Sequence, residues 1–446
     1  MSRFIGRLAP RIWFTRRALT VALSLVVLLA LGSAWPPLVG LAVAASIACA
    51  GAVIADFAVL ARANVAVTRE DPERFILGDR GALRYRADNR SATDLRLEIV
   101  ETPVPRLSLG ETPLAVTAGA RAHACGTLEA SPRDRGDGEL IGFAYRMRTA
   151  LGLVARVVRV TAPAAVRVWP ELSLLRRRGT LTQHRRTIEA GLRRLQMRGT
   201  GTDFESLREY AVGDSFRSIA WRATARRGKP IVVANTVERS QDVVLVLDAG
   251  RLMLGRLGAQ RKFDYAIAAA LTLAGAAATS GDRVGAVAFA STIVDAIAVG
   301  NGRAHAAAIA QRMHALQPRF EESDYEGAFA LVARRGSKRS LIVVFTDMFD
   351  PVASAALLAH LRRLVVRHLV VVVLLSDNAV ADALEREPRT ADAAYRAAVA
   401  IGVADDRRRA IAMLGRLGII VVDVPANEVS VALVNRYIDV KARGAL

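Results

Sequence analysis

The chain has 446 residues, which is too long for one ordinary core and enough for two or three units that each bury their own apolar surface. Its 62 Lys and Arg against 42 Asp and Glu give a formal net charge of +20. The cations are spread along the chain, which argues against a single nucleic-acid-binding stripe and suits a protein lying against an anionic leaflet. Cys49 and Cys125 form no CxxC pattern, so neither a disulfide nor a zinc site is expected.

The N-terminal segment 1–62 predicts a membrane anchor. Residues 18–34 and 38–55 carry no charge and are separated by a Trp-Pro-Pro turn, which predicts a two-helix transmembrane hairpin. Arginines precede the first apolar segment, and Arg62 and Arg69 follow the second. The positive-inside rule therefore places both ends in the cytoplasm, with the hairpin in a bacterial inner membrane. A cleaved signal peptide is the alternative for the first segment, and Asp56 is expected to reach the lipid headgroups.

The next two segments read as a spacer and a connector. Residues 63–170 contain short alternating runs separated by turn residues, which predict a small β-sandwich with a packing role. Within 171–240, residues 174–197 are rich in Arg and place Leu181, Ile188, Leu192 and Leu195 on one helical face. We expect this basic helix to pack its apolar stripe on a neighbouring domain; contact with a lipid leaflet, an acidic partner or a nucleic acid is the alternative.

A distinctive polar and aromatic pattern follows the basic connector. It comprises Phe204, Leu207, Arg208, Tyr210, Gly213, Asp214, Arg217, Trp221 and Arg226, in that order. The pattern resembles the signature of the domain of unknown function 58 family, membrane proteins with a von Willebrand factor A-like domain. Ala220 stands where that signature usually has Asp, and Ser215 replaces a common second Asp.

The signature segment also has a direct physical reading. Gly213 permits a turn, Asp214 can cap the helical turn after it, and Trp221 with Ile219 can anchor that turn to a core. Charged side chains nearby are expected to form a structural ion-pair cluster, because no Ser, Cys or His nucleophile accompanies them. We expect the nine signature positions to serve partner binding or positioning rather than catalysis.

Residues 241–446 alternate apolar strands with helices, which predicts a sheet covered on both faces. Residues 293–299 follow the preceding strand too closely for a crossover, so an antiparallel edge strand is expected there. The fold class expected for the chain is α/β, with a doubly wound, mostly parallel sheet of the von Willebrand factor A-like type. The two-helix transmembrane hairpin and the small β-sandwich precede it.

Two carboxylates are expected to meet where that sheet reverses its strand order. Asp248 ends the first strand, and Asp347 ends the strand that we place beside it. The resemblance implies a metal-ion-dependent adhesion site of the form Asp-x-Ser-x-Ser with a distant Thr and a distant Asp. Gly250 and Leu252 replace the two serines, and Ser323 or Asp324 lies in the region of the Thr.

The site predicted in this way is degenerate. Any Mg²⁺ is expected to bind weakly, and two close unpaired carboxylates predict that Asp248→Asn leaves stability unchanged or slightly raised. The alternative is that Asp248 and Asp347 simply end their strands facing solvent or cap helices.

No nucleotide-binding, metalloprotease or hydrolase motif occurs in the sequence. We therefore expect a non-enzymatic, membrane-anchored scaffold that presents its α/β domain to a protein partner, with no small-molecule substrate and no specific nucleic acid. The resemblance implies a MoxR-type AAA+ ATPase as that partner. The alternatives are a metal-dependent hydrolase that uses Asp248 and Asp347, or an Arg-rich nucleic-acid binder.

Overall fold

The structure is a computed structural model, and it divides into two compact units, Met1–Trp169 and Pro170–Leu446, which we describe separately. It describes residues 11–32, 35, 37–70, 72, 74–110, 113–170, 203–211, 216, 219–236, 240–335, 338–347, 351–376, 378–385 and 387–443. The predicted basic helix over 174–197 lies outside the described residues, as do Gly213, Asp214 and Arg217 of the signature.

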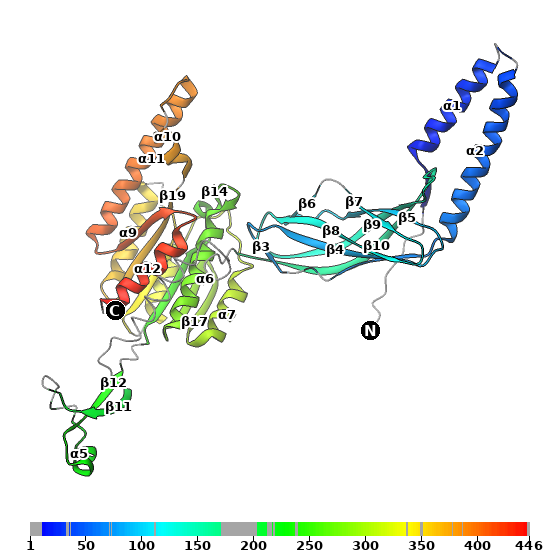
Figure 1. Cartoon of the computed structure of the whole chain (residues 1–446). Coiled ribbons are helices and arrows are strands. Elements are labelled where there is room, and N and C mark those ends of the chain that lie inside the picture. Colours follow the sequence, from blue (N-terminus) through cyan, green and yellow to red (C-terminus); the bar gives the residue numbers. More distant parts are fainter. Residues whose placement is uncertain are drawn as a thin grey trace. The chain divides into compact units, whose positions relative to one another are not determined.

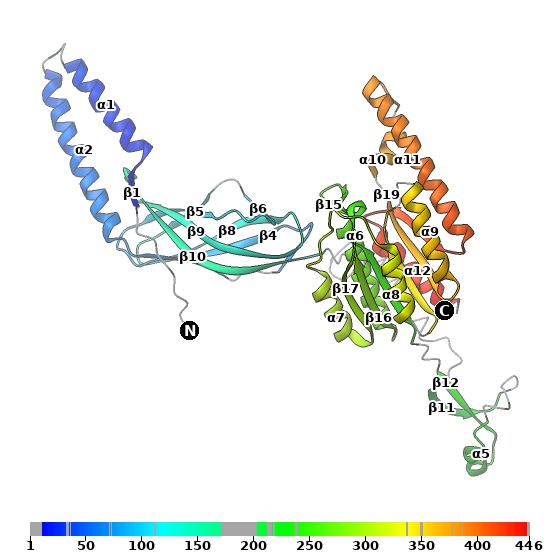
Figure 2. The ribbon, with the colours of Figure 1, turned by 180° about the vertical axis from the view of Figure 1, so that it is seen from behind.

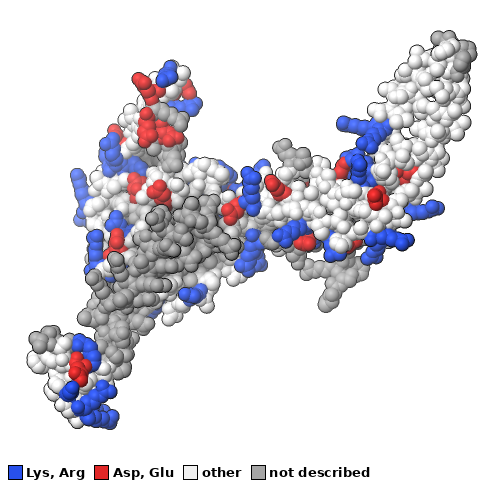
Figure 3. Space-filling view, viewed as in Figure 1, with Lys and Arg blue, Asp and Glu red and all other residues white. Residues whose placement is uncertain are grey.

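The first unit begins with strand β1 (Arg11–Phe14) and two helices, α1 (Arg16–Gly32) and α2 (Pro37–Arg62). The two helices lie side by side in both ribbon views and form what we call the helical arm (Figures 1 and 2). The arm is mostly uncharged beyond the point where it joins the rest of the unit (Figure 3).

The predicted two-helix transmembrane hairpin is not supported. Among the described residues, one helix, over Leu38–Arg62, is long and apolar enough to cross a membrane, with a mean hydropathy of 2.4. Helix α1 has 17 residues, about 25 Å at about 1.5 Å per residue, which is less than the hydrocarbon thickness of about 30 Å. The absence of charge over 18–34 therefore predicted a membrane-spanning helix, but the helix formed there is shorter than the hydrocarbon layer.

The strands of the first unit form two sheets. One has the order β1-β10-β9-β5-β7, with β3 beside β10, and the other has the order β2-β4-β8-β6. All their pairings are antiparallel except that between β3 and β10. The strands are β2 (Val65–Arg69), β3 (Phe75–Ile76), β4 (Gly81–Asn89), β5 (Leu95–Glu101), β6 (Leu107–Leu109), β7 (Leu114–Ala118), β8 (His123–Pro132), β9 (Gly136–Arg148) and β10 (Val154–Trp169).

Alternating side chains of both sheets fill one apolar core between them. In β5, for example, Leu95, Leu97 and Ile99 are buried, as the two-residue period of a strand requires. Strand β1 pairs with β10, so the residues just before the arm are part of the first sheet. We call the two sheets together the sandwich.

The second unit opens with a small element formed by part of the signature. Strand β11 (Asp203–Glu209) pairs with β12 (Ile231–Thr236), and the short helix α5 (Trp221–Arg227) lies between them. A bulge between Phe204 and Ser206 interrupts the pairing.

The remainder of the second unit is built on a six-stranded sheet of order β17-β16-β13-β18-β19-β20. Its strands are β13 (Asp242–Asp248), β16 (Arg283–Phe289), β17 (Ile293–Gly300), β18 (Ser340–Phe345), β19 (Leu369–Ser376) and β20 (Ile420–Pro425). Edge strand β17 is antiparallel, as predicted, and the other pairings are parallel. Strand β18 lies beside β13, which also confirms the neighbour that we assigned from the sequence.

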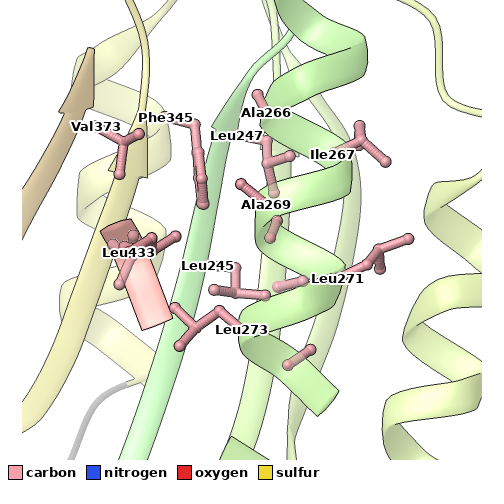
Figure 4. Packing of buried hydrophobic residues seen from close by; sticks show 14 of the residues in the cluster. Leu245, Leu247, Ala266, Ile267, Ala269, Leu271, Leu273, Phe345, Val373 and Leu433 are labelled. Carbon is pink, nitrogen blue, oxygen red and sulfur yellow. The ribbon is translucent and has the colours of Figure 1, made fainter. Parts of the chain in front are cut away.

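Helices cover both faces of this sheet (Figures 1 and 2). One core contains side chains of α6 (Lys262–Thr279), α7 (Gly302–Met313) and α12 (Val429–Ala442), and part of it is shown in Figure 4. The other contains side chains of α8 (Tyr325–Arg335), α9 (Pro351–Val365) and α11 (Ala391–Arg416). Along β13, Leu245 and Leu247 enter the first core while Val244 and Val246 enter the second.

Shorter elements complete this unit. They are the 3-10 helix η2 (Arg251–Leu254), the paired strands β14 (Arg256–Leu257) and β15 (Gln260–Arg261), and α10 (Asn378–Glu385).

The fold class predicted for the chain, α/β with a mostly parallel sheet, is wrong. The described chain is of mixed type: its sheets are mostly antiparallel, and the largest parallel arrangement is one mixed sheet with an antiparallel edge. The prediction gave too much weight to the strand–helix alternation after residue 240. Nearly continuous apolar strands are easier to recognise than the short strands of the sandwich.

Candidate functional site

Asp248 is fully buried at the end of β13, and its carboxylate accepts four hydrogen bonds. The Gly250 backbone N–H (2.8 Å) and the Ser323 hydroxyl donate to Oδ1. The Tyr325 and Thr346 hydroxyls each donate to Oδ2 over 2.8 Å. Two carboxylate oxygens offer about four lone-pair positions, so the acceptor capacity of Asp248 is filled by the protein itself.

Asp347 lies just after β18, is 2% exposed, and is paired with two cations. The Lys262 ammonium donates to Oδ2, and the Arg407 guanidinium lies 3.6 Å from Oδ1. Lys262 is the first residue of α6 and is itself only 6% exposed, and Arg407 also contacts Asp423. A buried carboxylate requires such partners because desolvation otherwise penalises its charge by several kcal/mol.

At most weak ion binding was expected at the two carboxylates, and the alternative was that they face solvent or cap helices. The structure buries both of them and satisfies both from within the chain. Of the other two candidate residues, Ser323 belongs to the Asp248 cluster. Asp324 instead accepts a 3.0 Å hydrogen bond from the Gly327 N–H in the first turn of α8.

The surroundings of Asp248 and Asp347 do not fit a magnesium ion. Mg²⁺ requires free oxygen ligands in near-octahedral geometry, and here an ammonium already neutralises Asp347 while four protons point at Asp248. Among the described residues, no group of three or more His, Cys, Asp or Glu side chains could hold a metal. Lys262, Tyr325, Thr346 and Arg407 were not singled out from the sequence.

Gly250, which stands where the resemblance has its first serine, is fixed by space rather than by backbone angle, since its φ is −82°. A Cβ there would lie 2.0 Å from Ser323 Oγ and 3.0 Å from the Glu321 carbonyl oxygen. A serine at position 250 is therefore incompatible with the hydrogen bond that Ser323 donates to Asp248.

Restoring that serine is expected to destabilise the domain instead of creating an ion site. Gly250→Ser should lower the free energy of unfolding by about 1–3 kcal/mol, because the new side chain overpacks the cluster. Adding Ser323→Ala should recover most of this loss. Urea unfolding of residues 171–446 measures both variants, and a single variant as stable as the wild type would contradict the packing argument.

Because of Tyr325, the stability of the folded domain is expected to depend on pH in the alkaline range. Burial raises the pKa of Tyr325 well above its usual value, and the Asp248 charge adds to the rise. The unfolded chain loses this proton near pH 10 while the folded chain retains it, so stability falls as pH rises above about 10. We expect a loss of up to about 1.4 kcal/mol per pH unit from this group, absent in Tyr325→Phe. Urea unfolding of both proteins at pH 8, 10 and 11 tests this, and parallel pH profiles would refute it.

The described part of the signature presents its apolar side chains to solvent. Trp221 is 70% exposed and Phe216 is 74% exposed, and Tyr210 stacks on Phe216 with ring centroids 5.9 Å apart. The expected anchoring of Trp221 in a core is therefore wrong. Leu207 and Arg208 are also exposed, and Arg226 lies in α5, which has no buried residues. The side chain of Phe204 is not among those described.

Exposed cations lie in the same small element. Helix α5 carries exposed Arg222, Arg226 and Arg227, and Lys229 follows it. In the described part of the expected ion-pair cluster, Glu209 pairs with Lys229 across 3.5 Å, and both side chains are more than two-thirds exposed. Such an exposed pair is worth little, so it contributes little to holding this element together.

Residues 206–410 match the family model described as Protein of unknown function DUF58. This part of the second unit is similar to the DUF58 family. The match spans the end of β11, the Asp248 cluster and most of α11, so the signature resemblance noted in the sequence is confirmed. No curated protein matches the chain.

Solved structures offer only distant similarity. BatB from Bacteroides thetaiotaomicron has 12% identity and a TM-score of 0.30, covering 46% of this chain and 99% of that one. An aerotolerance-related membrane protein from Bacteroides fragilis NCTC 9343 has 15% identity and a TM-score of 0.28, covering 45% and 98%. A protein of unknown function from Porphyromonas gingivalis W83 has 16% identity and a TM-score of 0.20, covering 25% and 50%.

Proposed function

We propose that this protein is a membrane-anchored, non-enzymatic scaffold that presents its second unit to a protein partner in the cytoplasm. Helix α2 is the anchor, because it is the described helix that is long and apolar enough to cross a membrane. Exposed Arg16, Arg17 and Arg62 lie at the ends of the arm helices that join the sandwich. The preference of cations for the cytoplasmic side of an inner membrane therefore supports a cytoplasmic location for the two units.

The observation that carries the docking proposal is the exposed aromatic surface of the signature. Large aromatic side chains and arginines dominate the energetics of protein interfaces, and Phe216 and Trp221 with Arg222 and Arg226 provide both kinds. We call these four residues the signature surface. Its positive charge favours a partner with an acidic docking face.

The hydrogen bonds and ion pairs of Asp248 and Asp347 favour a scaffold function over a hydrolase function. A metal-dependent hydrolase needs carboxylates that are free to hold an ion or activate water, and both carboxylates here are committed to internal donors. The partner that we propose is a MoxR-type AAA+ ATPase, on the strength of the family resemblance.

The test is a titration of the full chain, held in lipid nanodiscs, with a purified MoxR-type ATPase from the same organism. Phe216→Ala combined with Trp221→Ala should weaken binding by at least about tenfold, because two interface aromatics are lost. Tyr395→Ala is the matched control, since Tyr395 is a similarly exposed aromatic (72%) on α11. Equal affinity of the wild type and the double variant would contradict docking at the signature surface. Absence of any binding would contradict the choice of partner.

A further inference from the structure

The helical arm is joined to the sandwich without a linker. Asp56, near the end of α2, is 1% exposed, and its carboxylate accepts 2.8 Å hydrogen bonds from the Leu153 and Val154 N–H groups of the sandwich. Arg156 donates to the Leu60 and Ala63 carbonyls at the end of the helix over 3.0 and 3.2 Å. The carboxylate of Asp56 is therefore bound by the sandwich backbone and, contrary to the expectation, does not extend from the helix to lipid headgroups, and these hydrogen bonds fix the joint.

A second hydrogen bond holds the other arm helix at the same place. Thr15, just before α1, donates through its hydroxyl to the Gly152 carbonyl over 2.6 Å. Both helices thus start or end on residues 149–154 of the sandwich, which comprise the loop after β9 and the start of β10, and neither can move away without breaking these contacts.

The length of α2 then fixes how close the sandwich must come to a membrane. From Ala52 onward the helix packs on the sandwich core, with Leu60 fully buried. The free part, 38–51, is about 14 residues or about 21 Å, which is shorter than the hydrocarbon thickness of about 30 Å. When α2 is inserted across the hydrocarbon, it therefore draws the joint, and the sandwich residues around it, into the interfacial layer.

The side chains around the joint suit that environment. Trp13 and Phe14 on β1 are 59% and 69% exposed, and Ile54 and Phe57 on α2 and Leu151 in the loop are also exposed apolar residues. We call these five residues the root surface. Exposed Arg16, Arg17 and Arg62 lie beside them in sequence, and Figure 3 shows Lys and Arg side chains gathered where the arm meets the sandwich. Tryptophan at interface depth with flanking cations is the arrangement that a headgroup layer favours.

We propose that the root surface is a lipid-binding surface that seats the sandwich in the headgroup layer of an anionic bilayer. Trp13 and Phe14 reach the acyl boundary, and the three arginines contact lipid phosphates. The inference rests on the proposed membrane anchor. It goes further, because an anchored domain on a flexible linker would stay in water.

The experiment uses the full chain in nanodiscs of phosphatidylcholine and phosphatidylglycerol. The chain has four tryptophans, so single-tryptophan variants are made by replacing the other three with Phe. Their fluorescence is measured with lipids brominated at a shallow or a deep acyl position. Trp13 should be quenched at least about twofold more by the shallow bromines, as an interfacial side chain requires, and Trp221 should not be quenched.

Trp35, between the two arm helices, reports on the anchor separately. Quenching of Trp35 without quenching of Trp13 would overturn the lipid-binding root surface and leave the anchor standing. Absence of quenching at both positions would overturn the anchor and the inference together. If a triple replacement fails to fold, Trp13→Phe in the otherwise native chain should reduce the shallow-quenched component and leave the contribution of Trp35, and an unchanged signal would overturn the inference.

Discussion

Lys262→Met is expected to lower the free energy of unfolding of the second unit by about 3 kcal/mol, because it leaves the buried Asp347 carboxylate without its closest cation. Arg407 remains near Asp347, which places the loss at the lower end of the range for a broken buried pair. Urea unfolding of residues 171–446 measures the loss.

A matched pair of controls separates this effect from a general loss of charge. Lys229→Met removes a cation from an exposed pair and should change stability by less than about 0.5 kcal/mol. Lys262→Met combined with Asp347→Leu should regain most of the loss, because an apolar pair of similar volume avoids desolvation. A single variant at Lys262 that is as stable as the wild type would contradict the internal-cation account.

Asp248→Asn is expected to lower the free energy of unfolding by about 2 kcal/mol. Four donors converge on this carboxylate, and the amide replaces charge-assisted acceptors with one neutral acceptor and a donor. This reverses the expectation drawn from the sequence, which assumed two unpaired carboxylates that repel each other. Lys262 removes that assumption because it pairs with Asp347.

The same unfolding measurement provides the comparison. Asp392→Asn, at an exposed ion pair on α11, should change stability by less than about 0.5 kcal/mol. A value for Asp248→Asn at or above that of the wild type would favour the repulsion argument over the hydrogen-bond argument.

Sequence reasoning located the Asp248 cluster but not its chemistry. The apolar runs before Asp248 and Asp347 showed where two strands end. Because these strands are parallel neighbours, the two side chains lie together at the carboxyl ends of the strands. Apart from the Gly250 N–H, the partners of those carboxylates come from segments distant in sequence. Lys262 offered one usable signal. A cation at the first position of a helix is unfavourable with respect to the helix dipole, so its presence there indicates a nearby anionic partner. Arg407 offered none, because it stands in a run of three arginines that reads as a solvated face.

The anchor shows a different limit of sequence reasoning. Counting charges correctly found the apolar segments but could not show that Arg11–Phe14 is a strand of the sandwich or that Asp56 is buried against it. Both depend on backbone pairing and hydrogen bonding with residues about 100 or more positions later, and hydropathy contains no information about such contacts.

We propose that internal cations and donors take the place of a bound ion in the second unit. Thermal unfolding of residues 171–446 with EDTA and with millimolar Mg²⁺ tests this proposal. The account predicts the same unfolding temperature in both solutions. A bound ion at a hundredfold excess over its Kd would instead stabilise the domain by about 2.7 kcal/mol. A stabilisation of that size that disappears in Asp248→Asn would contradict this proposal and would show that the site binds Mg²⁺.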